Sequence, residues 1–484
     1  MIPRVFPYKE PRLQQLKIWE FLKNLEDVNT SIIEAPTGVG KTAAVLAYLL
    51  ENYDKIIWFT FTKRERKVVL REARKMNIDY MELRSLSDCC PLKEVREAMF
   101  PKQKCLFLRY YGKCPFILQC PYDTQFLATR EKRLIVLCQA WLHYFEKVRD
   151  IIEESSVIVF DEAHHIVLPQ EISIASRDFV LKAFKECSIG VKGTIVEKML
   201  REKVLEVDEN EIRYLRELGE KIVYRSGQSY LYELADRLDF VAKVFYDKKT
   251  KEYCGVVDVY PRLREIMSKK KVILISATFP KPYVEIVRRL SSCVADYRVR
   301  EHCFDFYTII HANRKLPKRK WGKRTLEYIE VILETVSKYF PRILVVFPSS
   351  DLLSKYTRVA ELPFNSEVII AGSREAEGIT IKAQCVVVLG VPYARITRGL
   401  IELMKILKKY TKKPRLAGYI APAVIRAIQA CGRVLRNNAT VVLVDKRWIK
   451  LKPLMPTWFR KPIKEITKGV DQLEERVAYY SCLT

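Results

Sequence analysis

The sequence reads Glu34-Ala35-Pro36-Thr37-Gly38-Val39-Gly40-Lys41-Thr42. It lies between residues 31–33, which are typical of a buried strand, and residues 43–50, which have the composition of a helix. A loop that binds phosphate groups lies between a strand and a helix, so this stretch is placed where such a loop must lie. The first position of the usual pattern is Ala35 rather than glycine. The alternative is an ordinary turn that contains glycine, and a second motif is needed to decide between the two.

Five residues of this stretch could bind a nucleoside triphosphate, namely Thr37, Gly38, Gly40, Lys41 and Thr42. The two glycines allow the backbone to turn its N–H groups toward phosphate oxygens. The lysine can reach the β- and γ-phosphates, and the hydroxyl group of the second threonine can hold Mg²⁺. We therefore expect a nucleoside triphosphate with Mg²⁺ as the ligand of this loop.

The second motif is Asp161-Glu162-Ala163-His164, which follows the continuous apolar run 157–160. Such a run is expected for a central parallel strand, and open α/β sheets bind ligands at the carboxyl ends of these strands. Asp161 can there hold the Mg²⁺ that bridges the phosphates, and Glu162 is placed to act as general base toward the attacking water. The motif alone could be the solvated start of a helix. The two motifs together favour a site that binds and hydrolyses a nucleoside triphosphate.

The chain as a whole is long and strongly basic. Its 484 residues are too many for one core, so two or more domains are expected. The net charge of +27 favours nucleic acid as a partner, although a solvated lysine-rich surface would also account for it. No apolar run is long enough for a transmembrane helix, and residues 1–8 lack the apolar core of a signal peptide. We therefore expect a cytoplasmic protein that does not act at a membrane.

Strand-like and helix-like segments alternate in two parts of the chain, which predicts two parallel sheets joined by right-handed crossovers. Within the first part, residues 170–265 contain charged, helix-like stretches and predict an insertion built of helices. The predicted fold class is therefore α/β, with two parallel-sheet domains. The runs that predict strands are 55–62, 133–138, 157–160 and 271–275 in the first sheet, and 342–347, 367–370, 384–389 and 440–444 in the second.

A third motif lies in the second part of the chain, where residues 429–436 are predicted to be helical. It reads Gln429-Ala430-Cys431-Gly432-Arg433-Val434-Leu435-Arg436. Arg433 and Arg436 are three residues apart and would share one face of this helix, with Gln429 one turn earlier. Two guanidinium groups on one face can reach a γ-phosphate held by the other domain and neutralise charge in the transition state. A basic, exposed helix is the alternative.

Together these motifs resemble superfamily 2 helicases and, within them, the XPD/DinG branch, from residue 7 to residue 448. Phe6-Pro7-Tyr8, followed by Gln15, resembles the adenine-recognising Q motif of that family. The resemblance implies two RecA-like domains, ATP with Mg²⁺ as the nucleotide, a contact between Gln15 and the base, and a 5′-to-3′ DNA helicase. Such an enzyme translocates on single-stranded DNA and acts on forked DNA, for example in DNA repair. The other stretches that resemble helicase motifs are 60–63 (Ia), 276–278 (III), 343–350 (IV), 372–380 (V), 429–436 (VI) and 445–448.

Three features depart from the family pattern. The insertion at residues 170–265 is short for the family. Thr380 stands where the family usually has Asp, and motif III reads Ser276-Ala277-Thr278 instead of Ser-Gly-Thr. We therefore interpret the chain as a compact archaeal paralogue. A translocase that hydrolyses ATP without unwinding duplex DNA is the nearest alternative. A nucleic-acid-binding scaffold with an inactive ATP site is disfavoured by the intact residues of the three motifs.

Five of the 13 cysteines, Cys89, Cys90, Cys105, Cys114 and Cys120, lie between motif Ia and the Asp161–His164 stretch, which is motif II of the family. In XPD-like helicases this part of the chain carries a [4Fe–4S] cluster, so the resemblance implies Cys90, Cys105, Cys114 and Cys120 as its four ligands. Cys90 is preferred over Cys89 because proline follows it and because its spacing to Cys105 is nearer to that of the family. A Cys₄ zinc site is the alternative, but the paired C-x₂-C knuckle is lacking.

These predictions divide the chain into two helicase domains and two insertions. We expect a monomer, and the sequence names no protein partner. Helicase domain 1 is expected to comprise residues 1–84, 126–169 and 266–280, interrupted by an iron–sulfur insertion (85–125) and a helical, Arch-like insertion (170–265), and helicase domain 2 to comprise residues 281–484.

Overall fold

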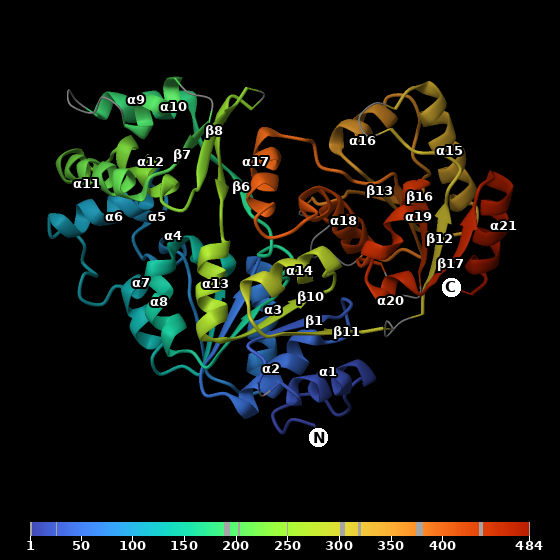
Figure 1. The fold of residues 1–484 in the computed structure, drawn as a ribbon, viewed down its shortest axis with the longest axis horizontal. Coiled ribbons are helices and arrows are strands. Elements are labelled where there is room, and N and C mark those ends of the chain that lie inside the picture. Colours follow the sequence, from blue (N-terminus) through green and yellow to red (C-terminus); the bar gives the residue numbers. More distant parts are fainter. Residues whose placement is uncertain are drawn as a thin grey trace.

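The structure is a computed structural model that describes residues 2–25, 27–187, 194–201, 204–248, 250–300, 305–317, 321–373, 381–434 and 439–483. Two parallel sheets form the cores of domain 1 and domain 2, and two insertions extend from domain 1 (Figure 1). Within the described ranges, no helix is both long and apolar enough to cross a membrane. The fold class predicted from the sequence, α/β with two parallel sheets, is confirmed.

Domain 1 is built on a sheet of seven parallel strands. The central strands are fully buried apolar runs, as expected for a parallel sheet covered on both faces. Helices α1 (Leu13–Lys23), α2 (Lys41–Asn52) and α3 (Lys63–Lys75) pack on one face. Helices α8 (Phe145–Glu154), α13 (Tyr260–Lys269) and α14 (Lys281–Leu290) pack on the other. The strand order is β11 (Val294–Arg298), β1 (Thr30–Glu34), β10 (Lys271–Ser276), β5 (Val157–Phe160), β2 (Ile56–Thr60), β4 (Leu134–Cys138) and β3 (Tyr80–Glu82).

The end of domain 1 lies later in the chain than the sequence predicts. Strand β11 pairs in parallel with β1, with Val294 opposite Thr30. Domain 1 therefore extends through residue 298, and the boundary expected after residue 280 is wrong. The segment escaped prediction because its residues, Val-Ala-Asp-Tyr-Arg, form a half-buried edge strand without an apolar run.

Domain 2 contains a sheet of six parallel strands, of which β12 and β17 were not predicted from the sequence. Helices α15 (Lys323–Ser337), α16 (Ser350–Tyr356) and α21 (Val470–Ser481) cover one face. Helices α18 (Ala421–Cys431), α19 (Arg447–Leu451) and α20 (Thr457–Arg460) cover the other. The strand order is β14 (Ser366–Ile370), β13 (Ile343–Phe347), β15 (Cys385–Leu389), β16 (Thr440–Val444), β12 (Tyr307–His311) and β17 (Ile463–Thr467).

The first insertion, between β3 and β4, holds the five cysteines and consists of short helices. These are α4 (Leu86–Cys89), α5 (Lys93–Arg96), α6 (Pro101–Tyr110) and α7 (Pro121–Ala128).

The second insertion, between β5 and β10, is not built of helices alone, so that expectation is wrong. A four-stranded antiparallel sheet accompanies its helices, in the order β6-β9-β8-β7. Helix α12 ends at Leu238, because the following residues are rich in the β-branched and aromatic types that favour strands. Its elements are β6 (Gln170–Ser176), α9 (Arg177–Glu186), α10 (Ile195–Arg201), β7 (Val204–Glu206), α11 (Glu209–Ser226), α12 (Tyr230–Leu238), β8 (Lys243–Asp247) and β9 (Glu252–Val257).

The second insertion contacts both the first insertion and domain 2 (Figure 1). On one side, the buried Gln103 donates from Nε2 to the Ser229 carbonyl at 2.9 Å and accepts from the Ser229 N–H at 2.6 Å. On the other side, helix α17 (Arg398–Leu407) of domain 2 packs against β6, β8 and β9. There Thr397 Oγ1 donates to Glu171 Oε2 at 2.8 Å. The second insertion therefore joins domain 2 to the cysteine-containing insertion.

Candidate functional site

The glycine-containing loop runs from the end of β1 to the start of α2, as the sequence predicts. Gly38 and Gly40 have φ values of +86° and +82°, in the left-handed region that favours glycine. A Cβ atom on Gly40 would also lie 2.4 Å from Gln15 Nε2, so the loop has no room for a side chain there. Lys41 is the first residue of α2 and is only 8% exposed. The N–H groups of this helix terminus are therefore available to an anion.

The N-terminal segment supports this loop from behind. Gln15 on α1 is buried, and its Nε2 donates to the Gly40 carbonyl at 3.2 Å. Its Oε1 accepts from the Arg12 N–H at 2.9 Å, and the Arg12 guanidinium donates to the Gly38 carbonyl. Gln15 thus contacts the backbone of the glycine-containing loop. Its contact with a base stays a prediction.

The acidic pair lies at the carboxyl end of β5, next to the loop. The Asp161 carbonyl accepts from Gln139 Nε2 at 2.7 Å, and Asp161 Oδ1 accepts from the Glu162 N–H at 3.0 Å. Glu162 has a φ value of +46°, which is uncommon for a residue with a side chain and costs on the order of 1–3 kcal/mol. The hydrogen bonds of the surrounding loop hold Glu162 in this conformation.

The pKa values of the two carboxyl groups, Asp161 and Glu162, are shifted in opposite directions. Burial raises the pKa of Asp161, the charge of Glu162 adds to the rise, and Lys41 opposes it. Burial also acts to raise the pKa of Glu162, but the adjacent His164 imidazole and the charge of Lys41 outweigh it, so the net shift is downward. Glu162 is therefore ionised at neutral pH, which a general base requires.

A third carboxyl group, that of Glu65, lines a cavity that Glu162 also lines, and it was not predicted from the sequence. Burial raises its pKa, and the charges of Glu162 and Asp161 add to the rise. Glu65 and Thr62 cap the first turn of α3: Thr62 Oγ1 accepts from the Glu65 N–H at 3.2 Å, and Glu65 Oε2 accepts from the Thr62 N–H at 3.0 Å. The Thr-x-x-Glu spacing is the capping-box pattern and could have revealed this pair.

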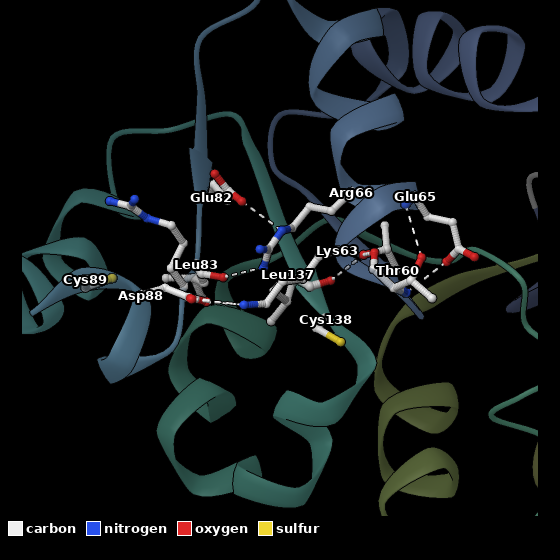
Figure 2. A network of polar contacts seen from close by, with 12 residues as sticks. Thr60, Lys63, Glu65, Arg66, Glu82, Leu83, Asp88, Cys89, Leu137 and Cys138 are labelled. Atoms are coloured by element: carbon white, nitrogen blue, oxygen red, sulfur yellow. Dashed lines mark hydrogen bonds and ion pairs between the residues drawn. The ribbon is translucent and has the colours of Figure 1, made fainter. Parts of the chain in front are cut away.

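Helix α3 leads from the cavity to the cysteine-containing insertion, and Figure 2 shows its polar contacts. Residues just after the cap pair with acidic residues on β3 and α4, at the entrance to that insertion. The ion pairs are Lys63–Asp88 at 2.8 Å and Arg66–Glu82 at 2.8 Å.

His164 connects the two domains. Its Nε2 lies 3.0 Å from Gln429 Nε2 of domain 2, so the glutamine amide donates and the imidazole accepts. His164 Nδ1 then carries the proton and donates to Ser276 Oγ at 2.8 Å, with Glu162 Oε2 3.3 Å away. Ser276 Oγ in turn donates to the Thr278 carbonyl at 2.9 Å. This chain of hydrogen bonds joins motif VI to motifs II and III.

The two domains enclose a cavity of about 190 Å³ at this point. Trp458 of domain 2 is buried and donates from Nε1 to the Ala277 carbonyl of domain 1 at 2.9 Å. A Cβ atom on Gly432 would lie 3.2 Å from Thr37 Oγ1, which shows how closely domain 2 approaches the phosphate-binding loop. The predicted site residues that line the cavity are Thr37, Glu162, Gln429 and Arg433.

Motif VI differs from its prediction in local structure. Helix α18 ends at Cys431, so Arg433 lies in the turn that follows and not on the helix. The expectation of a helix over residues 429–436 is therefore wrong at its end, because the Gly432 turn closes it. Arg436 and motif V residues 374–380 lie outside the described residues.

The cysteines of the first insertion divide into two kinds. Cys90, Cys105 and Cys114 share a small apolar core. Burial raises the pKa of Cys105, Arg109 opposes the rise, and the thiols of Cys120, Cys90 and Cys114 add to it. Arg109 Nη2 also donates to Cys120 Sγ at 3.0 Å.

Cys89 instead donates its Sγ–H to Gln125 Oε1 at 3.7 Å. In the described part of the chain, no group of three or more His, Cys, Asp or Glu side chains is arranged to hold a metal ion. The four cysteines therefore stay predicted ligands.

We expect His164 and Gln429 to act as one unit in ATP hydrolysis. Replacing either by alanine removes the same contact between the domains, so the double variant should be little worse than the worse single variant. A double-mutant cycle on the rate of ATP hydrolysis should give a coupling energy of about 0.5–3 kcal/mol. Combining His164→Ala with the distant Lys185→Ala should give additive effects. Additive effects for His164 and Gln429 would contradict a functional contact.

Comparisons with known proteins agree with this geometry. Residues 348–462 match the family model described as helicase C-terminal domain. A solved structure named XPD_Helicase is 19% identical and has a TM-score of 0.63, covering 95% of this chain and 100% of its own. S. tokodaii Xpd4 is 16% identical with a TM-score of 0.61, covering 94% and 100%. No curated protein sequence matches the chain.

Proposed function

From the XPD-like helicase fold of this chain, we propose that it is an ATP-dependent DNA helicase that translocates 5′ to 3′ on single-stranded DNA. The observation that carries the proposal is the cavity shared by the phosphate-binding loop, Glu162 and Arg433, with His164 bonded across it to Gln429. A site divided between two domains can couple hydrolysis to a change in their separation. Motor action requires such coupling.

The residues of domain 1 would hold and activate the nucleotide. The N–H groups of the loop and Lys41 bind the phosphates of ATP, and Thr42 and Asp161 are the residues that would hold Mg²⁺. When bound, Mg²⁺ neutralises charge on the phosphate oxygens. Glu162 accepts the proton of the attacking water.

The residues of domain 2 would complete the site. Arg433, together with Arg436, stabilises negative charge that develops on the γ-phosphate. Gln429 reports the state of the site to domain 2 through His164. Loss of the γ-phosphate weakens the contacts of domain 2 with the cleft and allows the domains to separate.

Single-stranded and forked DNA are the proposed nucleic-acid partners. The net charge of +27 raises the local concentration of any polyanion. A cavity of about 680 Å³ lies where domain 1, domain 2 and the second insertion meet. Its lining offers the two features that bind single strands, cations and aromatic rings. They are Arg395 and Arg426, and Phe61, His165 and Tyr419.

We also propose a [4Fe–4S] cluster held by Cys90, Cys105, Cys114 and Cys120. The donor set fits, because four thiolates are what the cluster requires and Arg109 offsets part of their negative charge. Cys89 is occupied by its hydrogen bond to Gln125. The cluster would supply a rigid cross-link within the insertion.

A role in DNA repair, a monomeric state and a cytoplasmic location are proposed together with the helicase function.

Forked DNA with a single-stranded tail tests the function and its direction. We expect ATP-dependent strand separation on forks with a 5′ tail and little on forks with a 3′ tail. Unwinding from 3′ tails would contradict the direction. ATP hydrolysis that DNA stimulates without strand separation on either fork would instead favour a translocase that does not unwind duplex.

A further inference from the structure

A separate cavity of about 270 Å³ lies where the second insertion meets α17 of domain 2. It shares no lining residue with the nucleotide cleft or with the larger cavity beside that cleft. Arg177, Tyr246, Lys248 and Tyr253 line it from the insertion, and Arg398 lines it from domain 2. Its wall is therefore assembled from two parts of the molecule that the chain joins only over a long distance.

Positive charge dominates the lining of this cavity. Arg177, Lys248 and Arg398 supply three cations, against the single carboxylate of Asp247. None of the three cations forms an ion pair with a described residue, whereas many other lysines and arginines of the chain do, such as Lys243. Three like charges gathered without partners repel one another, so the arrangement favours an anion between them.

Two aromatic rings complete the lining. Tyr253 is buried, and its ring centroid lies 5.1 Å from that of the half-buried Tyr246, at an interplanar angle of 57°. The inner ring thus fixes the outer one against the sheet. A tyrosine held beside arginines is the combination that binds a nucleotide, since the ring stacks on a base and the guanidinium groups bind phosphate.

We propose that this cavity binds one nucleotide unit, with its phosphate between Arg177 and Arg398 and its base against Tyr246. The unit can belong to a DNA single strand or be a free nucleotide, and both share this chemistry. For the strand, the inference rests on the proposed function. The pocket would then add a contact to the path of single-stranded DNA at the junction of the insertion and domain 2.

Binding across this junction would couple the insertion to the motor. Helix α17 already contacts the insertion through the Thr397–Glu171 hydrogen bond and through Lys243 and Glu402, 3.8 Å apart. A phosphate held by Arg177 and Arg398 adds a contact that exists only while the ligand is bound. Movement of domain 2 during ATP turnover would therefore load and release this nucleotide.

The test uses the full chain with Arg177→Gln and Arg398→Gln combined, and Tyr246→Ala beside Tyr246→Phe. Binding of labelled oligo(dT) is measured by anisotropy over a range of salt concentrations, and binding of dTMP by calorimetry. Loss of the contact with this one phosphate should reduce the log–log salt slope by about 0.7. Tyr246→Ala should weaken binding roughly tenfold, and Tyr246→Phe should not, because its ring still stacks. The controls are Lys185→Gln on α9 and Lys408→Gln just after α17.

Oligo(dT) and dTMP distinguish the two possible occupants of the pocket, a DNA strand and a free nucleotide. Weaker oligo(dT) binding places a DNA strand in the pocket, whereas weaker dTMP binding with unchanged oligo(dT) binding identifies a free nucleotide. Unchanged binding of both ligands, in variants whose thermal melting matches the wild type, would overturn the inference. Failure of the wild type to bind oligo(dT) would contradict the proposed function, while dTMP would still test the pocket.

Discussion

Replacing Lys41 with alanine is expected to abolish ATP hydrolysis while leaving DNA binding intact. Lys41 is buried at the start of α2, and its charge acts to lower the pKa values of Asp161 and Glu162. The variant removes the cation that binds the β- and γ-phosphates, so we expect the rate to fall by at least about a hundredfold. The measurement is phosphate release in the presence of single-stranded DNA, together with DNA binding without nucleotide.

The control for this substitution is Lys17→Ala, which removes an exposed lysine from α1. It should leave both activities unchanged. Turnover retained in Lys41→Ala would show that the loop is not the site of hydrolysis. Loss of DNA binding together with turnover, in a protein that still melts cooperatively, would contradict the separation of the nucleotide site from the DNA contacts.

Replacing Cys90 with serine is expected to remove the visible absorption of the protein purified without oxygen. The wild type should be coloured and contain about four irons per chain, as a [4Fe–4S] cluster requires. Serine offers no thiolate, so the cluster would lose one of its four ligands and be lost or become unstable. The measurement is the visible spectrum with the iron and zinc content.

Cys89→Ser is the matched control, because Cys89 lies next to Cys90, donates to Gln125 and is not needed as a ligand. It should keep both the colour and the iron. A colourless wild type with stoichiometric zinc would overturn the iron–sulfur proposal. The reverse pattern, loss of colour in Cys89→Ser but not in Cys90→Ser, would identify Cys89 instead of Cys90 as the first ligand.

Much of the two parallel sheets follows from the sequence. Strands such as β5 and β13 are continuous apolar runs, which is the usual composition of a strand covered on both faces. The start and end of α3 also follow from local chemistry, since Thr62 caps one end and the basic residues Arg74 and Lys75 lie in the last turn. These elements are specified by local chemistry.

Other elements depend on contacts that the sequence does not display. Strand β11 is half-buried at the edge of its sheet, and its pairing with β1 decides its conformation. The strands of the second insertion lie between helices, and the charged residues around them favoured a helical interpretation. The end of α18 is set by a turn at Gly432, which contacts the loop of the other domain.

The candidate site was predicted residue by residue but not as an arrangement. The chemistry of Lys41, Asp161 and Glu162 can be read from motif spacing, because each motif follows one strand. The contact of His164 with Gln429 joins residues 265 positions apart and depends on how the domains pack. The same holds for Trp458, whose indole N–H binds the backbone of motif III.

One cleft between the two domains is proposed to drive movement on DNA. The decisive measurement is the rate of ATP hydrolysis of the wild-type chain with and without single-stranded DNA. We expect a low rate without DNA and a rate many times higher with it, since DNA would hold domain 2 where Arg433 completes the site. A rate that DNA does not change, in protein that binds both ATP and DNA, would contradict this coupling.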